Sequence, residues 1–495
     1  MILWQREVKI FGEKQIIKIT PLILLVVLAI VLRIPNLFEP YWYGDEAIYL
    51  TLGEGIRQGL LLYRDIFDHK PPLIYLLAAL SGSLFWFKFA LLVSTCTSIV
   101  LFWRLANKLF DGNLNITLVA SIVFTLLTTL PTLEGNIANS ELFMLAPTIG
   151  AFFLLSDPKN VTVTRTFLAG LLFSVSFLYK IPGVFDFLAI VAFWVYVAKT
   201  RISFKRVLSY LGILALGLFI PIFISVVFFW LRGAAGPYLQ AAGIININYI
   251  SRWGSQASEG VGTGFLFRTI VFGGILGVLY LLKKYFSFKV LFLGLWLTFA
   301  LFAALLSGRP YPHYLIQVVP PFSLMLGVLA FGKLKERFLP IPFLLILAGA
   351  VLFYNFSHYQ VYPYYSNFLA FVLGQKTKEQ YFQSFDRRIP RIYALSEMLI
   401  SRTAQADRIF IWGTAPEVYA LSRRLPPVQY VTSFHIGDFG TGEEILKGLS
   451  HNKPKYIVIM PEETRILPGF QAFLAENYLY VENIDGAQVW KLRWF

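Results

Sequence analysis

The sequence has little charge and almost no cysteine. Only 14% of its 495 residues are Asp, Glu, Lys or Arg, and its single cysteine is Cys96. One thiol cannot form an intramolecular disulfide, and a cysteine metal cluster needs two or more. No internal repeat or low-complexity tract is evident. These absences exclude a disulfide scaffold, a thiolate cluster and a repeat architecture.

Hydrophobic residues are abundant instead. They make up 57% of the chain, and the mean hydropathy of +0.64 exceeds that of soluble globular proteins. Aromatic residues reach 17%, including 26 Tyr and 11 Trp. Such rings suit the membrane interface, although most of the Phe residues are explained by packing in helix cores. Lipid is therefore the expected solvent for much of the chain.

The net charge of +15 needs a membrane explanation as well. In a soluble protein it would suggest nucleic acid, but here Lys and Arg fall mostly in short loops between apolar runs. We interpret the charge as a topology signal, with attraction to anionic membrane lipids as a second effect and no nucleic-acid partner. Residues 1–20 are basic and no small-residue cleavage pattern follows them, so the first apolar run is predicted to be a retained span.

Apolar runs of near-spanning length recur along the first three quarters of the chain. A membrane-spanning helix needs roughly 20 apolar residues, and about eleven crossings are expected. The runs lie near residues 20–36, 71–106, 114–133, 139–155, 164–179, 183–198, 208–232, 264–282, 288–307, 313–331 and 338–356. The predicted fold is an α-helical polytopic membrane protein with about 11–13 transmembrane helices.

The loops between these runs segregate by charge. The basic loops 104–108, 159–165, 199–206, 283–289 and 333–337 all fall on the side of the N-terminus if residues 71–106 cross the membrane an odd number of times. This pattern predicts a cytoplasmic N-terminus. The opposite, outer face then receives the loops 37–70, 134–141, 180–183, 233–263 and 308–313, and everything after about residue 357. The run 71–106, which contains Lys88, could be a kinked span, an interfacial segment leading into a span, or three short traverses.

The composition becomes far more polar after about Asn355. Strand patterns occur at 408–412, 455–460, 478–484 and 488–492, and a helical pattern covers 415–424. We predict a transmembrane module over residues 1–356 and a small extracytoplasmic α/β domain over residues 357–495. Gly413 is a single glycine, whereas a dinucleotide fingerprint needs three at set spacing.

The start of the first outer loop is acidic. Asp45 and Glu46 follow Gly44 and open a stretch with helical spacing of apolar residues. Carboxylates there gain from the positive end of the helix dipole. They are either functional or simply a cap with a first-turn acid, and the local pattern does not separate these alternatives.

The end of the same loop is basic. Asp68, His69 and Lys70 precede Pro71 and Pro72, which can begin a helix. Lys70 is therefore expected at the membrane surface, at the depth of lipid phosphates. The alternative is an anchor lysine whose stem lies in lipid and whose ammonium reaches water.

Other outer loops also carry polar residues. These are Glu134, Asn136, Asn139 and Glu141 in the second loop, Lys180 between two spans, and Arg309, Tyr311, His313 and Tyr314 before a late span. Each alone is explained by capping, interfacial anchoring or snorkelling. Together they put acids that could activate a hydroxyl on the same face as cations that could hold a phosphate, which suggests transfer from a lipid-phosphate donor.

The order of these features resembles one superfamily. Asp45–Glu46, the stretch 63–72, Asn139–Glu141 and Arg309 with His313–Tyr314 are similar to the motifs of the GT-C membrane glycosyltransferases, specifically the dolichyl-phosphate-mannose protein mannosyltransferase and aminoarabinose transferase group. The resemblance implies a GT-C-like fold. It also implies an inverting hexosyl- or pentosyltransferase in a prokaryotic cell membrane, which takes sugar from a polyprenyl-phosphate donor to a lipid, glycan or protein acceptor.

The resemblance also implies residue roles. Asp45 would be the catalytic carboxylate and Glu46 would shape the site beside it, while Lys70 would contact the donor phosphate. Further donor phosphate or sugar contacts would come from His69, Arg64, Glu141, Asn139, Lys180, Arg309, His313 and Tyr314. Glu141 stands where many relatives have aspartate, so the sequence departs from the pattern there.

Alternatives to the enzyme remain on sequence grounds. A lipid-linked saccharide transporter or flippase would line its path with Asp45, Glu141 and Lys180, although transporter sites usually lie at mid-membrane in repeated halves. A non-catalytic lipid-binding or polymer-binding protein would look similar. No cofactor is demanded. A divalent metal could bind near Asp45 and Glu46 with His69 or His313, but no ligand spacing requires one.

Overall fold

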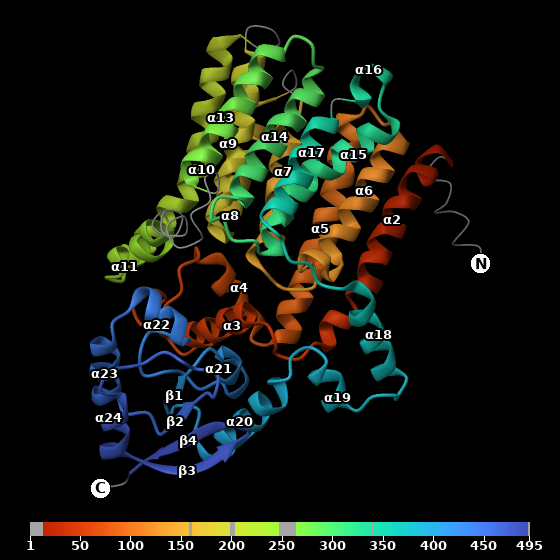
Figure 1. Cartoon of the computed structure of the whole chain (residues 1–495). Coiled ribbons are helices and arrows are strands. Elements are labelled where there is room, and N and C mark those ends of the chain that lie inside the picture. The colour runs from red at the N-terminus through yellow and green to blue at the C-terminus, as the bar shows by residue number, and fades with distance from the viewer. Residues whose placement is uncertain (1–12, 158–160, 199–202, 247–263, 339, 494–495) are drawn as a thin grey trace, which may run out of the picture. The chain divides into compact units, whose positions relative to one another are not determined.

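The computed structural model describes residues 13–157, 161–198, 203–246, 264–338 and 340–493, which form two compact units (Figure 1). Unit 1 comprises Met1–Ile34, Ala90–Ser225 and Ile247–Val361, and unit 2 comprises Pro35–Phe89, Val226–Asn246 and Tyr362–Phe495. The predicted basic N-terminus and parts of the predicted loops 159–165, 199–206 and 233–263 lie outside the described residues. The predicted domain boundary at residue 356 stays a prediction.

Unit 1 is built of helices. Its elements are α2 (Glu13–Arg33), α5 (Leu84–Leu109), α6 (Leu114–Thr129), η2 (Pro131–Leu133), α7 (Ser140–Leu155), α8 (Val163–Tyr179), η4 (Ile181–Gly183), α9 (Val184–Val197), α10 (Phe204–Leu231), α13 (Phe265–Leu282), α14 (Phe288–Ala304), η7 (Pro312–Val318), α15 (Val319–Phe331), α16 (Leu334–Arg337) and α17 (Pro340–Phe353). Residues 84–89 of α5 and 226–231 of α10 belong to unit 2.

Small residues let two of these helices meet backbone to backbone. A Cβ on Gly170 of α8 would lie 2.4 Å from the carbonyl oxygen of Leu214 in α10, and one on Gly217 would lie 2.4 Å from that of Phe167. Close approach at small residues is the usual way for helices to associate in lipid, where no hydrophobic force drives them together.

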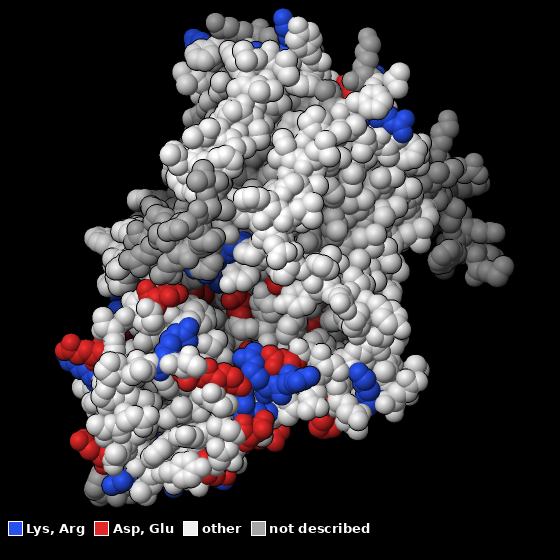
Figure 2. All heavy atoms as spheres, in the orientation of Figure 1, with Lys and Arg blue, Asp and Glu red and all other residues white. Residues whose placement is uncertain are grey.

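Five helical stretches in the described residues are long and apolar enough to cross a membrane. They are Thr20–Phe38, Leu84–Leu109, Phe204–Leu231, Phe265–Leu282 and Pro312–Phe331, and six shorter apolar helices accompany them. Only 17% of the apolar window in α10 and 11% of that in α13 is buried, so these helices expose apolar faces that lipid would cover. Figure 2 shows few charged side chains on the visible face of the unit 1 helices. The prediction of a polytopic helical membrane protein is confirmed.

The ambiguous run 71–106 forms two helices. A short helix, α4 (Leu73–Ser81), follows Pro71 and Pro72, and the longer α5 begins at Leu84. Gly82 separates them in the left-handed region at φ 69°, a conformation that glycine adopts without steric cost. Of the three alternatives, the structure matches a short segment leading into one long helix.

Unit 2 combines the loop 35–89 with a small α/β fold. Its helical elements are η1 (Pro35–Phe38), α3 (Gly44–Arg57), α4, α11 (Ala235–Leu239), the π-helical turn η5 (Gln240–Ile244), α18 (Val361–Val372), α19 (Lys378–Gln383), α20 (Ile389–Arg402), α21 (Pro416–Ser422), α22 (Ser433–Phe439), α23 (Gly442–His451) and α24 (Phe470–Asn477). Its four strands form one sheet of order β1-β2-β4-β3. The predicted small C-terminal α/β fold is confirmed.

The strands lie where the sequence pattern predicts them. They are β1 (Ile409–Trp412), β2 (Tyr456–Ile459), β3 (Tyr478–Ile484) and β4 (Ala487–Leu492). β1 pairs parallel to β2, while β4 pairs antiparallel to both β2 and β3. Gly413 follows β1 at φ 153°, and a Cβ there would lie 2.5 Å from the side chain of Met460. Its role is a tight turn after a buried strand.

The loop 35–89 packs on the C-terminal residues within unit 2. The hydroxyl of Thr51 in α3 donates a hydrogen bond to the carbonyl of Pro416 at 3.4 Å, and the Phe67 N–H donates to the carbonyl of Gln429 at 2.8 Å. On its other side α3 contacts α4 so closely that a Cβ on Gly53 would lie 2.6 Å from the backbone nitrogen of Ala79. The acidic start and the basic end of the loop are thereby held in one folded body.

Candidate functional site

The acidic end of the loop forms the first turn of α3. The helix begins at Gly44, so Asp45 and Glu46 lie at its positive end, as predicted. Their surroundings differ. The Asp45 side chain is 31% exposed and accepts a hydrogen bond from the Tyr49 hydroxyl at 3.1 Å, whereas the Glu46 side chain is 3% exposed. Only Asp45 of this pair can reach a molecule outside the fold.

Glu46 belongs to a buried ionic group. Lys88 lies 2.7 Å from a Glu46 oxygen and 3.0 Å from a Glu39 oxygen, and its side chain is fully buried. Glu39 also accepts hydrogen bonds from the Trp42 indole at 3.1 Å and from the Tyr364 hydroxyl at 2.6 Å. This network fixes the start of α3, so Glu46 orients Asp45 rather than facing solvent.

We expect Lys88→Met to destabilise unit 2. The change would leave two buried carboxylates without their cation, and removing one partner of a buried ion pair costs about 3–5 kcal/mol. The unfolding temperature of the purified protein in detergent should fall clearly. Adding Glu39→Gln and Glu46→Gln to the same variant should restore most of the loss, because no unpaired charge then remains. An unchanged unfolding temperature in Lys88→Met alone would show that the network carries no stability.

The basic end of the loop is held by tyrosines. The Lys70 N–H donates to the Tyr75 hydroxyl at 3.1 Å, and the Tyr63 hydroxyl donates to the Lys70 carbonyl at 2.8 Å. The Tyr75 hydroxyl in turn donates to Asp68 at 2.8 Å. Tyr63 adopts φ 72°, an uncommon conformation for a side chain of this size. The backbone of this segment is therefore fixed before any ligand binds.

The two ends of the loop meet at the Lys70 ammonium. Its Nζ lies 3.4 Å from Asp45 Oδ2 and 3.7 Å from Asp68 Oδ2, and 4.9 Å from the centre of the Tyr49 ring. The Lys70 side chain is 13% exposed. The structure thus joins Asp45 and Lys70, which the sequence placed at opposite ends of one loop.

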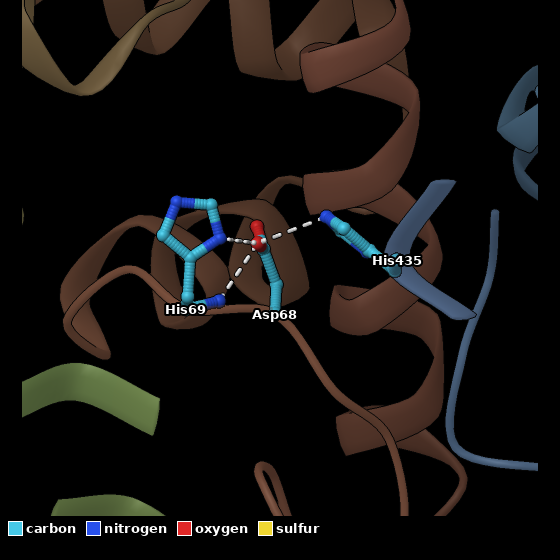
Figure 3. Close-up of side chains that lie close together, drawn as sticks. All are labelled: Asp68, His69 and His435. Carbon is cyan, nitrogen blue, oxygen red and sulfur yellow. Dashed lines mark hydrogen bonds and ion pairs between the residues drawn. The ribbon is translucent and has the colours of Figure 1, made fainter. Parts of the chain in front are cut away.

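Asp68 is buried beside two histidines. The Nδ1 of His69 lies 3.0 Å from Asp68 Oδ1, and the Nε2 of His435 lies 3.6 Å from the same oxygen (Figure 3). Burial alone would raise the pKa of Asp68, but the positive charge of Lys70 and the hydrogen bond from the His69 side chain help to outweigh burial and hold that pKa well below its usual value. Asp68 is therefore a carboxylate at any physiological pH. Burial lowers the pKa of His435 to about 4, so its imidazole is neutral.

Arg64 does not join this cluster. It is half exposed, pairs with its neighbour Asp65 at 2.7 Å, and donates to the Arg232 carbonyl at 3.4 Å. Its predicted contact with a donor stays a prediction.

Unit 1 contains a second polar cluster built from predicted residues. His313 Nδ1 lies 2.5 Å from Glu134, and Asn139 donates to Glu134 at 3.1 Å. Lys180 pairs with Glu141 and lies 4.4 Å from the centre of the Tyr314 ring. These side chains come from the loop before α7, the first turn of α7, the end of α8 and η7. The structure brings these residues into contact within unit 1, while their predicted role and that of Arg309 stay predictions.

Several residues of the cluster around Asp45, Asp68 and Lys70 were not selected from the sequence. Tyr49 and Tyr75 have the pattern of ordinary aromatic core positions, and His435 lies far along the chain in the C-terminal part. In the separate ionic group around Glu46, Lys88 did give a signal in the sequence, since a lone cation inside an apolar run implies a buried partner.

Comparison with known proteins finds similarity in structure only. No family model matches the chain, and no curated protein matches it. Among solved structures, ArnT from Cupriavidus metallidurans bound to undecaprenyl phosphate is 16% identical, with a TM-score of 0.59 over 94% of this chain and 97% of that one. The apo form of the same protein gives 15% identity and a TM-score of 0.56 over the same shares.

A third solved structure shows a weaker similarity. The archaeal oligosaccharyltransferase AglB from Archaeoglobus fulgidus, in complex with an inhibitory peptide and a dolichol-phosphate, is 14% identical with a TM-score of 0.49, covering 97% of this chain and 74% of that one. The resemblance predicted from the sequence is confirmed at the level of the fold: the chain is a helical membrane protein that shares the fold of ArnT.

Proposed function

We propose that the protein is a glycosyltransferase that moves a sugar from a polyprenyl-phosphate carrier to an acceptor hydroxyl at the outer face of the membrane. One observation carries the proposal, the 3.4 Å approach of the accessible Asp45 carboxylate to the Lys70 ammonium. This reaction needs a proton acceptor and a phosphate-binding cation within one sugar's reach of each other.

The fold supports the same conclusion. ArnT, which shares this fold over nearly the whole chain, is described in complex with undecaprenyl phosphate, a lipid carrier of the proposed kind. A transferase that uses such a carrier needs no nucleotide-binding fold, and the single Gly413 turn offers none.

The chemistry follows from the two side chains. The acceptor oxygen forms a bond to the anomeric carbon of the sugar while the bond from that carbon to the phosphate oxygen breaks. The electron pair of the broken bond leaves with the polyprenyl phosphate, whose growing charge Lys70 neutralises, and Asp45 takes the acceptor proton. One displacement of this kind inverts the anomeric carbon. An aspartate is a weak base for an alcohol, so orientation of the hydroxyl by Asp45 matters more than early deprotonation.

The remaining parts of the proposal concern the partners and the location. The second cluster, with Glu141, Lys180 and His313, would contribute donor phosphate or sugar contacts. The N-terminus would be cytoplasmic and the C-terminal fold extracytoplasmic, in the cell membrane of a prokaryote, since basic loops favour the cytoplasmic side. The acceptor would be a lipid, a glycan or a protein.

The test uses the purified full chain. Lipids that copurify with it would be identified by mass spectrometry, and a panel of polyprenyl-phosphate hexoses and pentoses would then be offered with lipid, glycan and peptide acceptors. We expect one donor to be consumed, with release of polyprenyl phosphate in equal amount to glycosylated product. Copurified lipids without a polyprenyl phosphate, together with no consumption across the panel, would overturn the proposal.

A further inference from the structure

Three side chains in unit 2 have the chemistry and spacing of a metal site. One ligand atom each from Asp68, His69 and His435 lies within 4.8 Å of the others. In Figure 3 the two imidazoles lie on either side of the Asp68 carboxylate and both rings are directed at it. The contacts of 3.0 and 3.6 Å from Asp68 Oδ1 bracket the separation of roughly 3.3 Å that neighbouring ligands have around a tetrahedral zinc ion.

The hydrogen bonding of His435 leaves room for such an ion. Its Nε2 faces Asp68 Oδ1 at 3.6 Å, which is longer than a normal hydrogen bond. The His435 side chain is only 2% exposed, so bulk water does not reach it. An ion bound to both Nε2 and Asp68 Oδ1 would lie between these two atoms.

The surrounding residues already orient the ligands. The second Asp68 oxygen accepts from the Tyr75 hydroxyl at 2.8 Å, and the His69 carbonyl accepts from the Asn246 side chain at 2.8 Å. Metal sites depend on such outer contacts. Here the Tyr75 hydrogen bond fixes the Asp68 carboxylate, and the Asn246 hydrogen bond fixes the backbone at His69. The His69 side chain is 18% exposed, so the site can be reached from its side.

We propose that Asp68, His69 and His435 bind one divalent transition-metal ion of the zinc class. Two imidazole nitrogens and one carboxylate oxygen suit Zn²⁺, whereas Mg²⁺ and Ca²⁺ prefer oxygen ligands. Three protein ligands leave a fourth position for water. The ion links the loop segment that carries Lys70 to α22 of the C-terminal fold. It therefore acts as a clamp that holds the Asp68–Lys70 segment in place, and it does so whatever reaction the protein performs.

Metal content of the purified full chain tests the proposal. After exchange into metal-free buffer with equimolar Zn²⁺ and removal of the excess, elemental analysis should find about one zinc per chain. His435→Gln should lose most of this zinc. His451→Gln is the matched control, because His451 is an exposed histidine of the same unit, and this variant should retain zinc like the wild type.

A second measurement needs no variant. Chelator-treated wild-type protein should unfold at a higher temperature when Zn²⁺ is added, because the ion binds the folded state. Co²⁺ added in place of zinc should give the visible absorption of a four-coordinate ion. Wild-type protein that binds no zinc and shows neither response, or His435→Gln that retains as much zinc as the His451→Gln control, would overturn the proposal.

Discussion

Asp45→Asn is expected to lower the turnover number of sugar transfer by about 10²- to 10⁴-fold, the usual contribution of a positioned acid or base. Asparagine has the same shape, and its carbonyl can still accept the hydrogen bond from the Tyr49 hydroxyl. It cannot take a proton from the acceptor. The fold should persist, because the Asp45 side chain is 31% exposed and the neighbouring Glu46 stays paired with Lys88. Steady-state kinetics would measure the effect, with the donor that the polyprenyl-phosphate panel identifies.

The matched control for this variant is Asp438→Asn. Asp438 is an exposed aspartate of α22 in the same unit, so the same chemical change there should leave turnover near that of the wild type. The two variants should unfold at similar temperatures. Wild-type turnover in Asp45→Asn would remove the carboxylate from the mechanism and with it the central assignment of the proposed function.

Lys70→Met is the second substitution with a large expected effect. Methionine keeps an unbranched stem of similar length beside the Tyr49 ring but removes the charge that would bind the donor phosphate. Turnover should fall by about 10²- to 10³-fold, the loss seen when one group that stabilises a developing negative charge is removed. The KM for the lipid donor should rise as well, since the phosphate is charged in the ground state too. Kinetics at varied donor concentration separate the two effects.

Two further variants make this experiment specific. Lys447→Met removes an exposed lysine of α23 in the same unit and should change neither parameter. Lys70→Arg keeps the charge and should recover part of the activity, though a planar guanidinium differs in geometry from a compact ammonium. If Lys70→Met transferred sugar with wild-type KM and turnover, the lysine would be an interfacial anchor, which was the alternative interpretation of the sequence.

The features that could be predicted from the sequence are those with a local pattern. The strands β1 to β4 follow from short apolar and alternating runs, and the positions of Asp45 and Lys70 follow from a helix start and a proline pair. Their convergence needed only that one loop fold back on itself. The resemblance to the GT-C glycosyltransferases came from the order of motifs over the whole chain rather than from any one of them.

The features that were missed depend on long-range pairing. His435 meets Asp68 across more than 360 positions of sequence, and Glu39 meets Lys88 across 49. No local pattern encodes such partners, because what selects them is the packing of α22 and of α5 against the loop. The short α4 was also hard to separate from α5, since an apolar run shows its length but not a break at a single glycine such as Gly82.

The sharing of unit 2 between residues 35–89 and 362–495 has a consequence for how the protein is made. The ribosome releases the loop early and its supporting residues last. The loop must therefore wait for most of the chain before Thr51 and Phe67 find Pro416 and Gln429. Contacts between such distant segments form slowly. A nascent or truncated chain that ends near residue 361 would carry every candidate catalytic side chain and yet lack the scaffold that brings them to working positions.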